Sequence, residues 1–426
     1  MAANTHDRSI WSHADFRRLW MAQTISEIGS QISFLALPLV ATIILDASPL
    51  QMGILTAASS LPSLLLGLHT GALVDRRSKR PLLLAADIGR ALLLLVIPLA
   101  WLFHMLSIEL LFAVAFLGGF LALVFHVAYQ TFLLTILDRR RIVDGNSKLE
   151  LSRTAAEIVG PGLAGWLIHL LTAPIAIVFD AGSYVLSAIC IRGIRTREGV
   201  PAIAIQPLRL RQEIGDGVRA VLGDARMRTI VGSSGLLELF NAMLDTVSIL
   251  YLVRTLEIGP ELIGIIFTAG SIGFVVGAIL PNVLARHLGI GRVTVLSISL
   301  VGFSDLLIPL AHGSMLVVVP LLIVAQMLFG LGLTVFKVNR SSLRQALIPL
   351  QMQGRATATM HMLSTGLIPL GAILGGVIGE WIGIRHTLVI AASGELLAAF
   401  WIWRSPLRTL HGLPGKPVPS PVSPVG

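Results

Sequence analysis

Long runs of apolar residues dominate the chain, and each is close to twenty residues long or longer. About twenty apolar residues is the length that a helix needs to cross the hydrocarbon core of a bilayer. The runs lack the alternation of apolar and polar residues that marks membrane-spanning β-strands, so they predict helices. The pattern gives twelve spans: 17–45, 51–74, 81–103, 107–136, 147–171, 173–191, 227–253, 259–284, 292–311, 314–338, 355–380 and 384–403.

Composition points the same way. Of the 426 residues, 54% are hydrophobic and 13% are charged, and the mean hydropathy is +0.83. A soluble domain carries about twice that charged fraction, so we predict an all-α, multi-pass membrane protein. The lone Cys190 excludes a disulfide framework within the chain. The first fifteen residues are polar and show no cleavage pattern, so the first span is expected to be an uncleaved membrane helix.

The basic residues are unevenly distributed between the two sides of the predicted membrane. Of 32 Lys and Arg residues, 28 lie in the N-terminus, the alternate loops and the C-terminal tail. The opposite loops hold Arg254 and Arg385, and Arg90 and Arg153 lie inside spans. Because basic loops stay on the cytoplasmic side, we expect both termini in the cytoplasm. Charge spread over so many loops does not favour a nucleic-acid-binding surface.

The longest connection divides the spans into two sets of six. We predict an N-terminal bundle (1–191), a cytoplasmic linker (192–226) with an amphipathic helix at 208–222, a C-terminal bundle (227–403) and a Pro-rich tail (404–426), disordered at its end. The halves are weakly similar: "FRRLWMAQTISE" and "MRTIVGSSGLLE" each reach a Glu eleven residues after a basic start. Such an internal repeat is typical of transporters whose substrate path lies between two homologous halves.

Charge is concentrated in the loop between spans two and three, "GALVDRRSKR", with five charged side chains in six positions. A glycine allows helices to approach closely, and an acid is favoured at a helix N-terminus. Asp75 is therefore expected to help latch the two halves together on the cytoplasmic side; an ordinary helix cap is the alternative. The corresponding loop of the second half, 281–292, has Ala285 in place of this acid. The candidate gating residues are Gly71, Asp75, Arg76, Lys79 and Arg80.

This loop resembles the cytoplasmic signature of the major facilitator superfamily, Gly-x-x-x-Asp-Arg-x-Gly-Arg-Lys, with Ser78 in place of the turn glycine. "AEIVGPGLAG" in the fifth span resembles the Gly-Pro motif of its antiporter branches. The chain is also similar to the bacterial branch with macrolide-efflux proteins and enterobactin exporters, over about residues 13–403. This similarity lies in four segments: "FRRLWMAQTIS", "DGNSKLELSRTAAEIVGPGLAG", "FDAGSYVLSA" and "QGRATATMHMLSTGLIPLGAILGG". The resemblance implies two pseudo-symmetric six-helix bundles and proton-driven export of a small apolar or amphipathic molecule. Because the resembled branch is bacterial, it also implies a place in the bacterial inner (plasma) membrane. The antiporter-type residues are Gly160, Pro161, Gly162 and Gly165.

Two pairs of charged residues inside the spans are spaced to neutralise themselves. Asp87 and Arg90 are three residues apart, and Arg153 and Glu157 are four apart, so each pair shares one helix face. His126 and His361 are read as interior residues. The roles of Asp180 and Asp305 stay open.

Glu27 differs, because it lies near mid-bilayer with no basic residue within one helical turn. Gln31 shares its face, and Glu238, Asn241 and Asp245 form one polar stripe in the seventh span. The resemblance implies that the first and seventh helices line a central cavity. Poor solvation favours the protonated form of a carboxyl, which suits proton coupling. The alternative is hydrogen bonding between helices by protonated acids.

We therefore predict a proton-coupled exporter, not an enzyme, that works by alternating access. No cofactor or metal site is expected, and the partners are the small-molecule substrate, protons and the lipid bilayer, with no nucleic acid. We expect a monomer. The alternatives are a siderophore exporter or a lysophospholipid flippase of the same fold, and further off a non-transporting membrane sensor or enzyme.

Overall fold

The computed structural model describes residues 10–138, 141–196, 198, 215, 218–349, 352–410 and 412. Across these ranges all regular structure is helical, and twelve helical segments are long and apolar enough to cross a membrane. The predicted all-α membrane fold with twelve spans is thus confirmed. The helices cluster into two compact units: Met1–Gln206, Ala242–Ala269 and Ile368–Thr387 form the first, and Pro207–Asn241, Gly270–Leu367 and Leu388–Gly426 form the second.

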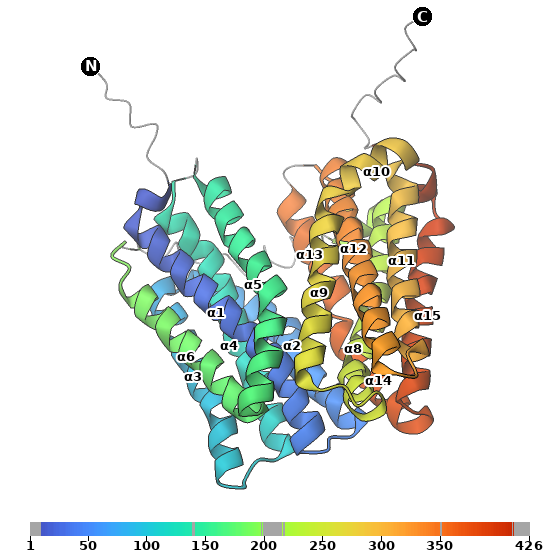
Figure 1. The fold of residues 1–426 in the computed structure, drawn as a ribbon. Coiled ribbons are helices and arrows are strands. Elements are labelled where there is room, and N and C mark those ends of the chain that lie inside the picture. The colour runs from blue at the N-terminus through green and yellow to red at the C-terminus, as the bar shows by residue number, and fades with distance from the viewer. Residues whose placement is uncertain are drawn as a thin grey trace, which may run out of the picture. The chain divides into compact units, whose positions relative to one another are not determined.

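The first unit contains the first six spans side by side, drawn blue to green (Figure 1). Helix α1 packs on α5 and α6, α3 packs on α4 and α6, and α2 packs on α4. Phe16, Leu83, Phe132 and Ile191 are among the buried side chains of its core. The elements are η1 (Ile10–Ser12), α1 (Ala14–Leu39), η2 (Val40–Ile44), α2 (Pro49–Asp75), α3 (Lys79–Leu102), α4 (Ile108–Ile136), α5 (Ile142–Leu171) and α6 (Ala173–Arg192).

Local sequence chemistry sets where α2 begins. Ser48 Oγ accepts from the amide of Gln51, and the Gln51 side chain accepts from the Ser48 amide at 2.9 Å. This reciprocal capping box satisfies two amides that the first turn leaves without helical partners. Pro49 follows as the first helical residue, where no amide donor is needed. The start of the span is therefore fixed by three nearby residues, Ser48, Pro49 and Gln51.

The first unit also includes parts of three later spans. These are the end of α8 (Ala225–Leu250) with its π-helical turn η3 (Tyr251–Thr255), the start of α9 (Pro260–Ile279), and α14 (Ile368–Ile382). Helix α2 packs on α14 so closely that a Cβ atom at Gly53 would lie 2.5 Å from the Ala372 carbonyl oxygen. The compact units therefore do not follow the sequence halves, and the division into 1–191, 192–226, 227–403 and 404–426 stays a prediction.

The second unit is built around α11 and α12, which pack along each other. Phe336, Ile298, Ile402 and Leu407 are buried in its core. Its elements, besides the rest of α8 and α9, are α10 (Pro281–Leu288), α11 (Ile290–Leu310), α12 (Met315–Leu347), α13 (Gln353–Thr365), most of α15 (Ile384–Trp403) and η5 (Pro406–Thr409).

Three details differ from the predicted pattern or lie outside the described residues. The eighth span ends at Ile279 because Pro281 begins a separate short helix, and the eleventh is interrupted between α13 and α14, just before Pro369. The tail starts as a packed turn, with Leu407 buried in η5. Most of the tail, residues 413–426, lies outside the described residues. So does most of the helix predicted at 208–222; residues 218–223 are described and are helical.

Candidate functional site

Glu27 lies near the middle of the first membrane span, which runs from Ala14 to Ile44. It is about 20 Å along the helix from Ala14. Its side chain is half-buried, and the Gln23 side-chain amide donates to Glu27 Oε1 at 2.6 Å. Within the described part of the chain, Glu27 forms no ion pair. A carboxyl at this depth is therefore held by a neutral amide.

A row of charged side chains on α5 lies beside Glu27. Arg153 donates to Glu157 Oε1 at 2.9 Å and also pairs with Glu150. The predicted Arg153–Glu157 pair is confirmed, and Glu150 extends it. Glu27 is within electrostatic reach of Arg153 and Glu157. The Arg153 side chain is 47% exposed. Exposed charges in a membrane span face a water-filled space and not hydrocarbon, so these residues form a polar lining.

Helix α4 adds further polar groups to this lining. Tyr129 is within electrostatic reach of both Glu27 and Glu150. One turn away, His126 Nε2 and Gln130 Nε2 are 2.9 Å apart, and both side chains are exposed. Polar side chains of three helices, α1, α4 and α5, thus gather around one carboxyl.

The Gly-Pro motif of α5 packs against two different helices. A Cβ atom at Gly160 would lie 2.4 Å from Gln31 Cβ, so Gln31 of α1 contacts α5 at this glycine. At Gly162 it would meet Thr268 Oγ1 at 2.7 Å, and at Gly165 it would lie 2.9 Å from Gly264 Cα. Helix α5 continues through Pro161 without ending. The motif therefore provides tight contacts to α1 and α9.

The stripe on α8 differs from the Glu27 site. Glu238 and Asn241 are half-buried, and Asp245 is exposed. Arg340 of α12 is within electrostatic reach of Glu238, as Arg153 of α5 is of Glu27. Glu238 and Asn241 belong to the second unit and Asp245 to the first, and a chamber shared with Glu27 stays a prediction.

Two further acids are buried in the core of the first unit. Arg90 donates to Asp87, which also accepts from Ser187 Oγ at 2.6 Å, so the predicted Asp87–Arg90 pair is confirmed. The Arg90 guanidinium lies 4.1 Å from the centre of the Tyr184 ring. Asp180 is 1% exposed and accepts from Ser183 Oγ. These contacts join α3 to α6, which indicates a packing role for the pair.

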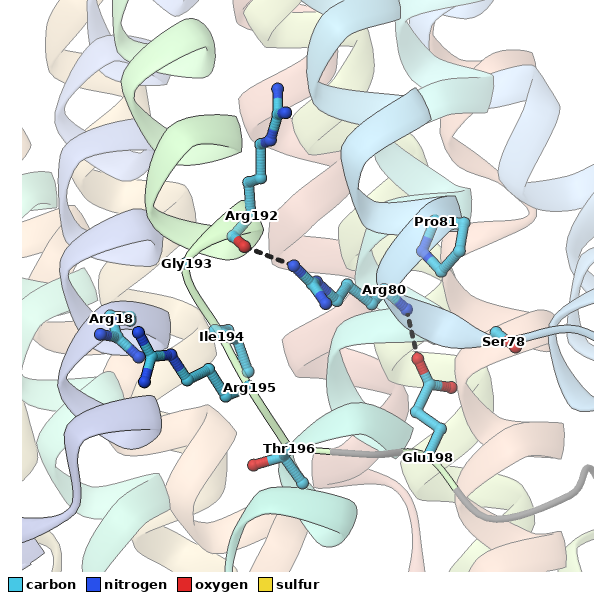
Figure 2. A pocket seen from close by; sticks show the side chains of 10 residues that line it. All are labelled: Arg18, Ser78, Arg80, Pro81, Arg192, Gly193, Ile194, Arg195, Thr196 and Glu198. Carbon is cyan, nitrogen blue, oxygen red and sulfur yellow. Dashed lines mark hydrogen bonds between the residues drawn. The ribbon is translucent and has the colours of Figure 1, made fainter.

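The charged loop after α2 is bound by an acid from elsewhere in the chain (Figure 2). Glu198, in the segment after α6, accepts from the amides of Lys79 at 2.5 Å and Arg80 at 2.7 Å. The next residue, Pro81, has no amide hydrogen, so one carboxylate satisfies the first turn of α3. The Arg80 side chain in turn donates to the Arg192 carbonyl oxygen.

The structure contradicts one expectation for the gating residues, and their role as a gate stays a prediction. A Cβ atom at Gly71 would meet no described atom within 4 Å, so the expected close helix approach there is wrong for this conformation. Asp75 is the last residue of α2, and its side chain lies outside the described atoms. Arg76 caps the end of α2 and is exposed. The acid at the N-terminus of α3 is therefore Glu198, signalled in the sequence only as the first acid after the basic residues that follow span six.

A second acid holds the segment after α6 to α1. Asp15 accepts from the amides of Arg195 at 3.2 Å and Thr196 at 2.9 Å, and from Thr196 Oγ1 at 2.7 Å. It also pairs with Arg18 at 2.9 Å. The chain leaving α6 is thus bonded to the starts of both α1 and α3.

At the opposite end of the first unit, polar contacts join early and late spans. Arg254 of η3 donates to Asp46 Oδ1 at 2.6 Å, and His169 of α5 lies 3.0 Å from Glu261 of α9. These contacts accompany the glycine contacts between α5 and α9. At this end the first six spans are therefore closely joined to parts of the seventh, eighth and eleventh.

Comparison with known proteins identifies the family. The family model described as "Transmembrane secretion effector", of the major facilitator type, matches residues 9–421. The chain belongs to this family. It is 26% identical to the uncharacterized MFS-type transporter YfiS of Bacillus subtilis (strain 168), covering 87% of this chain and 88% of YfiS. It is also 26% identical to the multidrug efflux pump Tap of Mycolicibacterium fortuitum, covering 87% of this chain and 91% of Tap.

Solved structures agree on the fold. A crystal structure of a point mutant of the nucleoside transporter NupG superposes with a TM-score of 0.77 at 15% identity, covering 91% of this chain and 99% of NupG. At 15% identity this similarity shows only that the two proteins share a fold. The protein is a multi-pass membrane transporter of the major facilitator fold, and it is not an enzyme.

Proposed function

We propose that this transporter exports a small hydrophobic or amphipathic molecule, such as a drug or macrolide, in exchange for protons. The observation that carries the proposal is Glu27, a half-buried carboxyl near mid-span that is bonded to a neutral amide. The family of this chain is described as "Transmembrane secretion effector", which supports export. The related Tap is a multidrug efflux pump, which supports a drug-like substrate. An anionic carboxylate in a membrane is costly, so a small change in its surroundings decides whether it holds a proton.

The groups around Glu27 suit a reversible proton site. Gln23 can donate to a carboxylate and can accept from a carboxylic acid, so the pair stays bonded in both states. Arg153 is engaged by two other acids, Glu150 and Glu157, which leaves the lining with more acids than bases. This acidic surplus attracts protons and positively charged amphipathic molecules. Bound substrate and bound proton would therefore compete for Glu27, which is the requirement for exchange transport.

The polar contacts at the two ends of the first unit suit a mechanism of alternating access. We propose that the termini and basic loops face the cytoplasm of the bacterial inner membrane, so the contacts of Arg254 and His169 lie on the outer side. Those contacts must break for outward release. Asp75, Arg76 and the Glu198–α3 contact belong to the cytoplasmic gate, and Glu238, Asn241 and Asp245 to the substrate path. The transporter would work as a monomer.

The test is efflux of a fluorescent amphipathic dye from bacterial cells, with and without a protonophore. Glu27→Gln keeps the size of the side chain and an oxygen that can accept from Gln23, but it removes the carboxyl group that carries the proton. It should reduce protonophore-sensitive efflux to about the background of cells without the transporter, while energy-independent counterflow of dye persists. Glu109→Gln, exposed in the first turn of α4, is the matched control and should export normally. Export by Glu27→Gln at the parent rate, with the same protonophore sensitivity, would refute proton coupling at this residue.

A further inference from the structure

A basic pocket lies at the end of the first unit where α1 and α3 begin and α6 ends (Figure 2). Its volume is about 840 Å³. The pocket is lined by α1, by the first residues of α3 and by the segment that leaves α6. Its charged lining residues are Arg18, Arg80, Arg192, Arg195 and Glu198, and Ser78 and Thr196 add hydroxyl groups.

The charges of the pocket are not balanced. Four guanidinium groups line it against one carboxylate, and that carboxylate, Glu198, already accepts from two amides of α3. Arg18 is paired with Asp15. Arg192 and Arg195 are exposed, and neither forms an ion pair with any described residue. The lining therefore keeps a net positive charge that its own acids do not neutralise.

The pocket also holds a buried donor without an acceptor. One terminal nitrogen of Arg80 donates to the Arg192 carbonyl oxygen, but Arg80 Nε is buried and makes no hydrogen bond within the described structure. The nearby Ser78 hydroxyl makes no capping bond. Buried donors are almost always paired, so an orphan beside uncompensated cations indicates an acceptor that the described part of the chain does not supply. The matching acceptor is an anion with several oxygens, and phosphate fits the fork of arginine donors.

The position in the fold selects the source of that phosphate. The pocket lies at the ends of three membrane spans, which is the level of lipid headgroups. Basic pockets between spans on the cytoplasmic side are suited to anionic headgroups. We propose that this pocket binds the phosphate group of an anionic membrane lipid through Arg80, Arg192 and Arg195. The lipid would tie the start of α3 to the end of α6, and its binding does not depend on the proposed transport activity.

The test is a titration of the purified full-length protein with phosphatidylglycerol, followed by native mass spectrometry in detergent. Loss of one guanidinium should weaken binding of the first lipid about fivefold, and loss of two about thirty-fold. The variants are Arg195→Gln alone and Arg192→Gln with Arg195→Gln. The matched control is Arg286→Gln with Arg292→Gln, two exposed arginines of the second unit, and it should bind as the parent does.

Two further measurements test whether the bound phosphate comes from an anionic lipid. Phosphatidylcholine should bind more weakly than phosphatidylglycerol, and inorganic phosphate at the same concentration should not displace the lipid. The proposal is overturned if the double variant binds like the parent, if the control pair loses as much, if phosphatidylcholine binds equally well, or if free phosphate competes. The single variant provides a second measurement if the double variant is unstable.

Discussion

Replacing Gly165 by alanine should shift the transporter away from the conformation described above. A Cβ atom at this position would lie 2.5 Å from the Pro260 carbonyl oxygen and 2.9 Å from Gly264 Cα. Both are backbone atoms, so no side chain can rotate away. Helices α5 and α9 would have to separate by about 0.9 Å before the methyl group reaches an ordinary contact distance of 3.4 Å.

The energy follows from this overlap. Forcing one methyl group into a packed contact costs about 1–3 kcal/mol. If transport requires this end of the molecule to open, the open conformation relieves the overlap, and only the closed one bears the cost. The open-to-closed ratio should then rise about 5- to 150-fold.

Thiol labelling measures the shift. Cys190 is the lone cysteine, so Cys190→Ser gives a clean background, and Thr268→Cys places a thiol next to α5. Its labelling rate by a water-soluble maleimide should rise with Gly165→Ala as long as the open form is scarce. Gly182→Ala is the control, because a Cβ atom there would meet nothing within 4 Å. Equal labelling of the Gly165 variant and its parent, with both proteins folded, would show that the contact does not bias the conformation.

Three further predictions concern stability and gating. Glu198→Ala should lower the free energy of unfolding by about 1–2 kcal/mol, since it removes the cap of α3. Glu198→Gln should lose less, because its amide oxygen can still accept from an α3 amide; thermal melts in detergent measure both, and an unchanged melt for Glu198→Ala would contradict the cap. Asp87→Ala leaves the Arg90 guanidinium buried without its ion-pair partner, which should lower the free energy of unfolding by about 3–5 kcal/mol. Replacing both Asp87 and Arg90 by leucine should recover most of that loss in the same thermal melts. Additive losses of stability would argue against their pairing. Gly71→Ala should leave efflux and melting temperature unchanged within error, and a loss above twofold would show that this glycine forms a close contact in another conformation.

The hydrophobic pattern was sufficient to predict the spans, because apolar run length is set by the bilayer and not by tertiary detail. It was weaker where proline interrupts a run, since both Pro281 and Pro369 lie inside segments that are apolar enough to continue. Charge pairs at helical spacing, such as Asp87 with Arg90, were predictable because both partners lie on one helix face.

Contacts between distant segments were not predictable in the same way. Glu198 is 119 residues from Lys79, and nothing in a single sequence specifies that its carboxylate meets the α3 amides. Tyr129 and Arg153 likewise reach Glu27 only through the packing of α4 and α5. The sequence could propose Glu27 as a candidate from its depth, but the neighbours that tune it depend on the tertiary fold.

The bonds from Asp15 and Glu198 also bear on how the chain can be divided. Asp15 and Glu198 bond the segment after α6 to the starts of α1 and α3, so the chain that packs with the first six spans continues past Arg192 to Glu198. A split transporter expressed as two polypeptides should therefore be cut after Glu198. A cut directly after Arg192 would remove Glu198 from the amino-terminal fragment and leave the amides at the start of α3 without their acceptor. That fragment should be less stable than the one that ends at Glu198.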